Sequence, residues 1–134
     1  MNWERIKVFL DTRRDTPFKW GTFDCCLFCA DAWVAAGYPD PAATYRGRYR
    51  SERGANRLMK EAGSLRNLAE ACLGPPYSLK LACPRGAIVY GTAPSVGPLL
   101  GLAAGPEFLV PNPDHGFRGL PLQLATAYWL PGEP

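Results

Sequence analysis

The stretch Pro17–Trp33, PFKWGTFDCCLFCADAW, contains three of the five cysteines of the chain. Asp24 stands directly before an apolar run and can cap a helix over Cys25–Ala36, which Gly37 would end. Apolar residues occupy almost every side of this helix, and a helix of that kind is normally buried. We therefore expect it to be the central helix of the fold.

Helical patterns extend over residues 1–74, and strand patterns follow. The other predicted helices are Asn2 to about Arg13, 52–62 after the cap Ser51, and 65–73 after the cap Ser64. Short apolar runs bounded by Gly and Pro predict strands over 86–91, 97–104, 106–111, 119–125 and 127–130. Helices followed by strands indicate one α+β domain over 1–134, with a helical part (1–74) packed on a small antiparallel sheet (75–134).

The composition is that of a soluble globular domain of 134 residues, with 47% hydrophobic and 20% charged residues. No apolar run approaches the roughly 18–20 residues that span a membrane. The N-terminal stretch MNWERIKVFLDTRR has no signal-peptide pattern. We expect a protein made in the cytoplasm, with free thiols rather than disulfides.

The net charge of +3 is mild, but Arg46, Arg48, Arg50 and Arg53 lie close together, and Arg57 can extend the cluster. A solvated surface is the simpler interpretation, and contact with an acidic protein or nucleic acid is the alternative. Because the rest of the chain has no basic stripe, we expect no specific nucleic-acid binding.

The segment WGTFDCCLF resembles the cysteine motif of NlpC-type cell-wall peptidases, which have a papain-like fold. Trp20, Gly21, Asp24 and Cys25 match that motif, whereas Cys26 and Leu27 replace its usual Ser-Gly. The later segment PRGAIVYG is similar to a strand that follows the helices in that superfamily. The resemblance implies a papain-like fold with Cys25 at the nucleophile position.

A second resemblance covers more of the chain. The same cysteine stretch, followed by DPAATYRGRYRSERGANRLMKEAG, resembles a small phage and prophage family encoded among tail genes. This resemblance implies a virion protein of the tail tip that contacts other tail-tip or hub proteins.

Catalysis at Cys25 would need a thiolate, which a helix N-terminus and a neighbouring histidine favour. In NlpC-type enzymes the histidine opens a strand, and the corresponding strand here, LLGLAAG, places Leu99 at that position. The third polar residue of that family has no clear counterpart around EFLVP, unless Glu107 replaces it. His115 is the only histidine, and it follows the expected strand.

We therefore expect a degenerate peptidase scaffold that serves as a structural or assembly component of a phage tail tip. The alternative is a cysteine peptidase or amidase that cleaves peptidoglycan during DNA entry, with Cys25 as nucleophile and His115 as base.

A second alternative is a metal- or cluster-binding tail protein. Cys26, Cys29, Cys72 and Cys83 could supply four thiolates to Zn or an Fe–S cluster. Adjacent helical residues diverge by about 100° around the axis, so Cys25 and Cys26 should not both face one ion. Buried thiols are the simpler interpretation, and we expect no cofactor.

Aromatic and arginine side chains are typical anchors of protein interfaces. The candidates for contact with neighbouring proteins are Tyr45, Arg46, Arg48, Tyr49 and Trp129. For Trp129, completion of the last strand is the alternative role.

Overall fold

A computed structural model describes residues 2–132 and has an α+β architecture. Its helices are α1 (Trp3–Asp11), α2 (Cys25–Ala35), α3 (Glu52–Ala62) and α4 (Leu65–Leu73). Its strands are β1 (Tyr77–Ser78), β2 (Ile88–Ala93), β3 (Gly97–Ala103), β4 (Glu107–Pro111), β5 (Phe117–Pro121) and β6 (Ala125–Trp129), with a 3-10 turn, η1, at Leu122–Leu124. The predicted order of helices and then strands is confirmed.

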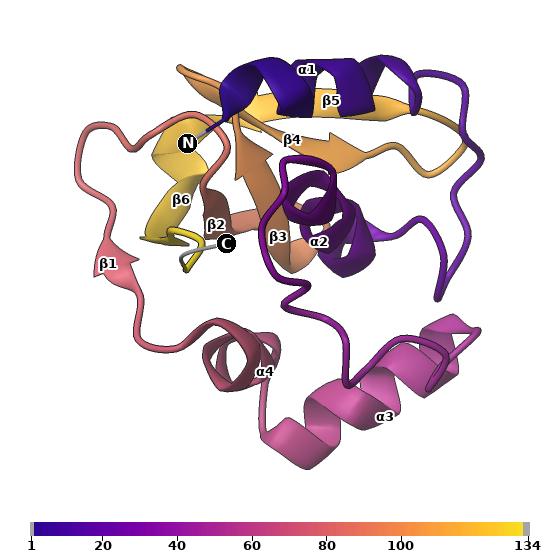
Figure 1. Cartoon of the computed structure of the whole chain (residues 1–134). Helices are drawn as coiled ribbons and strands as arrows, with labels where there is room; N and C mark the ends of the chain where they lie inside the picture. Colours follow the sequence, from indigo (N-terminus) through magenta and orange to yellow (C-terminus); the bar gives the residue numbers. More distant parts are fainter. Residues whose placement is uncertain (1, 133–134) are drawn as a thin grey trace.

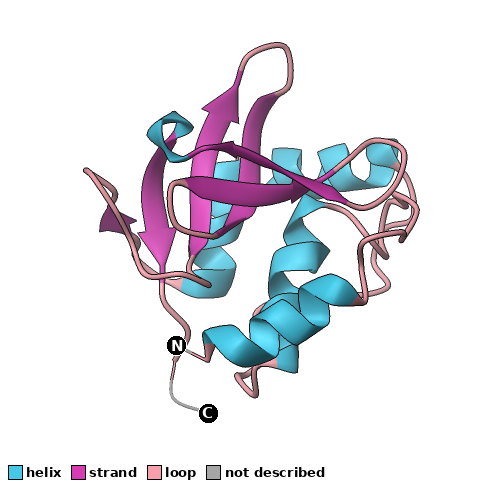
Figure 2. Ribbon diagram, turned by 90° about the horizontal axis from the view of Figure 1, so that it is seen from above, coloured by secondary structure: helices cyan, strands magenta, loops and turns pink. Residues whose placement is uncertain are grey.

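The strands form one antiparallel sheet in the order β1-β6-β2-β3-β4-β5. Figure 2 shows the strands gathered on one side of the molecule and the longer helices on the other. In Figure 1, α2 lies beside β3, whereas α3 and α4 form a pair that stands away from the sheet. None of the helices in residues 2–132 has the length and apolarity to span a bilayer.

The predicted strand over 119–125 is wrong. The chain leaves β5 after Pro121, makes the η1 turn over Leu122–Leu124, and begins β6 at Ala125. Leu122 is buried in this turn, so the apolar run reflects burial rather than extended backbone. The two-residue strand β1, which pairs with β6, has no clear pattern in the sequence.

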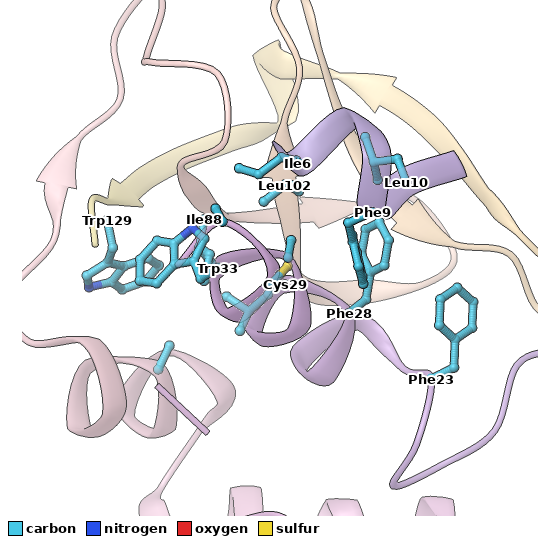
Figure 3. Close-up of a cluster of buried hydrophobic side chains, with 14 of the residues drawn as sticks. Ile6, Phe9, Leu10, Phe23, Phe28, Cys29, Trp33, Ile88, Leu102 and Trp129 are labelled. Atoms are coloured by element: carbon cyan, nitrogen blue, oxygen red, sulfur yellow. The ribbon is translucent and has the colours of Figure 1, made fainter. Parts of the chain in front are cut away.

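The main core lies between α2 and the sheet (Figure 3). Helix α2 buries residues on several sides, among them Phe28, Cys29 and Trp33, as its apolar sequence predicts. The Trp33 indole donates a hydrogen bond to the Gly86 carbonyl at 2.8 Å, which satisfies its one polar atom. The buried central helix is confirmed.

The opposite face of the sheet has a second apolar cluster. Along β3, Leu100 and Leu102 pack in the core with α2, whereas Leu99 and Ala103 pack in the second cluster. Successive side chains of a strand point to opposite faces, so this division follows from the pleat.

Candidate functional site

Asp24 holds Cys25 in the first turn of α2. Its buried carboxylate accepts hydrogen bonds from the Leu27 amide at 3.0 Å, the Gly21 amide at 2.9 Å and the Tyr49 hydroxyl at 2.6 Å. Burial and the Asp24 charge raise the pKa of Tyr49, so its hydroxyl stays protonated and donates. The predicted helix cap is confirmed, and it also ties the loop before α2 to the loop after it.

Cys25 lines a cavity of about 640 Å³ between α2, the α3–α4 pair and the sheet. Its walls are mainly apolar, and the polar side chains among them include Tyr45, Tyr49, Glu52 and Arg118. Cys25 and Cys26 are each partly exposed. A thiol at a helix N-terminus therefore faces a space large enough for a ligand.

The Sγ atoms of Cys25 and Cys26 lie 3.9 Å apart, so the expected divergence of their side chains is wrong. The Cys26 thiol and the Leu100 backbone form hydrogen bonds that lower the pKa of Cys25, although burial opposes them. The hydrogen bond to Cys25 and burial raise the pKa of Cys26 well above its usual range. Cys25 is therefore the more acidic of the two thiols.

The other cysteines do not complete the four-thiolate set considered above. Cys29 and Cys72 line the same cavity as Cys26, but Cys83 packs against the second apolar cluster. Burial raises the pKa of Cys29, Cys72 and Cys83, which disfavours the thiolates that a metal would need. Across residues 2–132, no three His, Cys, Asp or Glu residues are grouped to hold a metal ion.

Three residues of β3, Pro98, Leu99 and Leu100, line the cavity with Cys25. Leu99 also packs in the second cluster, while Leu100 packs in the core with α2 and its backbone contacts the Cys25 thiol. This strand therefore offers no imidazole to the thiol. Glu107, the displaced candidate on β4, is exposed and is not part of the cavity wall.

The structure does not bring His115 into the cavity with Cys25. His115 is exposed in the loop between β4 and β5, where its backbone forms an isolated bridge with Pro17. The residues that line the cavity, all within 2–132, do not include it. The only imidazole of the chain is therefore absent from the wall around the candidate nucleophile.

Trp20 and Gly21, the other matched motif residues, help to build this wall. Trp20 lines the cavity and meets the Phe18 ring edge-on at 5.1 Å. Gly21 has a φ of +83°, and a side chain there would collide with the Tyr49 carbonyl. The Trp-Gly pair thus has a structural role next to Cys25, whatever chemistry the thiol performs.

The segment 40–49 closes the cavity on one side through contacts that sequence reasoning missed. The Arg46 guanidinium binds Asp31 of α2 at 2.7 Å and Asp40 at 2.6 Å. Asp40 also accepts a hydrogen bond from the Ala42 amide at 2.9 Å. The sequence DPAATYRGRY is distinctive, but it does not by itself predict that Arg46 contacts Asp31 of α2.

These contacts change the role of several interface candidates. Trp129 is only 1% exposed and donates from its indole to the Gly74 carbonyl at 2.8 Å, so a surface anchor at this position is wrong. Arg46 and Tyr49 are engaged within the protein. Arg48 is exposed and lies over the Tyr45 ring at 5.2 Å, which leaves its guanidinium available to a partner.

Comparison with known proteins places the chain in a family. Residues 1–130 match DUF6950, a domain of unknown function. The chain belongs to the DUF6950 family. Comparisons with curated proteins and with solved structures give no match. The match covers the helices, the sheet and the cavity, so all of the geometry described above belongs to this DUF6950 domain.

The geometry predicts selective modification of Cys25. At neutral pH, iodoacetamide should alkylate Cys25 about tenfold faster than Cys26 or Cys29, because the thiolate is the nucleophile and only Cys25 has a lowered pKa. Timed alkylation followed by tandem mass spectrometry, which assigns each label to its cysteine, measures the rates.

Two substitutions of its neighbour provide the control. Cys26→Ser retains a hydrogen-bond donor and should preserve most of the Cys25 rate, whereas Cys26→Ala should slow it several-fold. Equal Cys25 rates in the two variants would show that Cys26 does not stabilise the thiolate.

Proposed function

We propose that this DUF6950 protein is a structural or assembly component of a phage tail tip, built on a degenerate NlpC-like, papain-like scaffold. The motif residues Trp20, Gly21, Asp24 and Cys25 support the scaffold, since Cys25 begins a buried helix that packs on an antiparallel sheet. The resemblance of residues 17–63 to the tail-gene family supports the location in the virion and the tail-hub partners.

The cavity wall around Cys25 is the observation that supports a protein without efficient hydrolytic activity. The β3 residues that line the cavity with Cys25 are Pro98, Leu99 and Leu100, and none of their side chains can accept a proton. The two carboxylates in the cavity wall are Asp24, which already accepts three hydrogen bonds, and Glu52. Efficient hydrolysis by a cysteine nucleophile needs a base within hydrogen-bond reach of the thiol.

A cysteine peptidase or amidase acting on peptidoglycan is the second candidate. The lowered pKa of Cys25, produced mainly by the Cys26 thiol, and its position in a large cavity favour it. This function would require the loop that carries His115 to move toward α2, or a base supplied by a partner. It predicts catalysis that is abolished by the loss of Cys25 and only slowed, several-fold, by the loss of Cys26.

Digestion of purified peptidoglycan separates the two candidates. We expect the wild-type protein to release no more soluble fragments than its Cys25→Ala variant. The peptidase candidate is supported instead if digestion is lost in Cys25→Ala and His115→Ala but survives in Cys26→Ala. An active cell-wall peptidase assayed in parallel verifies the substrate.

The assembly function is tested in particles produced from the genome that encodes this chain. Mass spectrometry of purified tails should detect the protein, and the Cys25→Ala variant should be incorporated equally and leave infectivity unchanged. Failure to co-purify with tails would contradict the virion location. Equal incorporation with lost infectivity would contradict a purely structural role for Cys25.

A further inference from the structure

A second hollow, of about 410 Å³, runs from the loop before α3 along the helix to its last turn and is called here the basic hollow. It is lined by Arg48, Arg50 and Arg57, together with Gly47, Tyr49, Ser51, Gly54, Leu58 and Glu61. The three arginines are exposed, and within residues 2–132 no ion pair involves any of them. Three guanidinium groups therefore share one concave surface with a single carboxylate.

The charges of the basic hollow are not balanced within it. One end lies at the start of α3, where the helix dipole is positive and Glu52 of the first turn is the compensating acid. Arg48 and Arg50 precede the Ser51 cap, and Arg57 lies in the second turn, four residues before Glu61. The three arginines repel one another, and a bound anion would reduce that repulsion.

Arg46, in contrast, is held by acidic side chains of the protein itself. Its guanidinium lies 2.7 Å from Asp31 of α2 and 2.6 Å from Asp40. No comparable pair of acids holds the arginines of the basic hollow in the described chain. One arginine of this region, Arg46, therefore stabilises the fold, whereas the three arginines of the basic hollow remain available for an external partner.

We infer that the basic hollow binds an acidic segment of a partner protein, one that carries at least two neighbouring carboxylates. The planar fork of arginine matches a carboxylate with two parallel hydrogen bonds, which favours such a ligand. The hollow is local and the net charge is only +3, which favours a short acidic segment over a long polynucleotide backbone. The inference extends the proposed assembly function, and it depends on that function for the assumption that the partner is a protein.

Fluorescence anisotropy with a labelled octaglutamate peptide tests this inference at a fixed, low salt concentration. We expect saturable binding that weakens about fivefold in Arg57→Gln and at least about 30-fold in the triple variant Arg48→Gln, Arg50→Gln, Arg57→Gln. Arg118→Gln is the matched control, because Arg118 is also exposed and unpaired but lines the other cavity. Its binding should stay within about twofold of the wild type.

Three results would overturn the inference. The first is equal binding by the wild-type protein and the triple variant. The second is equal weakening in Arg118→Gln, which would indicate attraction by net charge alone. The third is tighter binding of an eight-nucleotide oligothymidine than of the peptide, which would point to nucleic acid. A failure of peptide binding would not affect incorporation into tails, so it can be distinguished from a failure of the proposed function.

The unfolding temperature distinguishes a ligand-binding role of the three arginines from a structural role, because the two roles predict shifts in opposite directions. Without ligand, the triple variant should unfold at a higher temperature than the wild type, because the repulsion among the three arginines is removed. A lower unfolding temperature would show that these arginines stabilise the fold, and it would count against a ligand site.

Discussion

The Asp24→Ala variant is expected to lose about 3 kcal/mol of unfolding free energy, a large share of the stability of a domain of this size. The substitution removes the cap of α2, which costs about 1 kcal/mol. It also leaves the half-buried Gly21 amide and Tyr49 hydroxyl without their acceptor, at about 1 kcal/mol for each group. The loss should appear as a lower midpoint of urea unfolding monitored by circular dichroism.

Ser51→Ala is the matched control for the Asp24 prediction. Ser51 caps α3 through a single hydrogen bond to the Gly54 amide at an exposed position, so its loss should cost only about 1 kcal/mol. A double-mutant cycle with Tyr49→Phe should show a coupling of about 1 kcal/mol between Asp24 and Tyr49. If Asp24→Ala costs no more than Ser51→Ala, the three-way network does not stabilise the protein as described.

The capped helices are the part of the fold that the sequence predicts best. The side chains of Asn2, Asp24, Ser51 and Ser64 each accept a hydrogen bond from a backbone amide three residues further on. This contact is local, so the identity and spacing of nearby residues are enough to predict it. The apolar surface of α2 is likewise a property of one short segment, and its burial follows directly.

The strand region was harder to predict because its short apolar runs have more than one explanation. The run 119–125 combines part of β5, where Leu120 is half-buried, with the buried Leu122 of the η1 turn and the buried Ala125 of β6. Leu99 and Leu100 of β3 pack in different clusters, although both line the cavity with Cys25. Pairing with β2 and β4 sets the face that each residue takes, and a single sequence does not show the pairing.

The sequence predicted only those features of the candidate site that depend on neighbouring residues. The position of Cys25 beside its cap follows from neighbouring residues, whereas the wall formed by segment 40–49 depends on contacts with α2 across many residues. Tyr49 is 25 residues from Asp24, and Arg46 reaches back to Asp31. Side chains this far apart in sequence were therefore interpreted as surface anchors, although Tyr49 lines the cavity and Arg46 is held by two carboxylates.

Gly21→Ala should destabilise the protein by about 3 kcal/mol and open the wall beside Cys25. An alanine Cβ would lie 2.2 Å from the Tyr49 carbonyl oxygen, a backbone atom that cannot rotate away. The positive φ of +83° adds about 1 kcal/mol for any residue with a Cβ. The chain around Tyr49 must shift, which weakens its hydrogen bond to Asp24.

Gly47→Ala separates the two costs of the Gly21 substitution. Gly47 has nearly the same φ, +79°, but no atom lies within 4 Å of the Cβ that an alanine would place there. It should therefore show the backbone cost alone, about 1 kcal/mol, and leave the alkylation rate of Cys25 unchanged. The difference between the two variants in urea unfolding measures the close approach of Gly21 to Tyr49. Equal losses in the two variants would show that the loop relaxes freely, in which case segment 40–49 is not a fixed wall of the cavity.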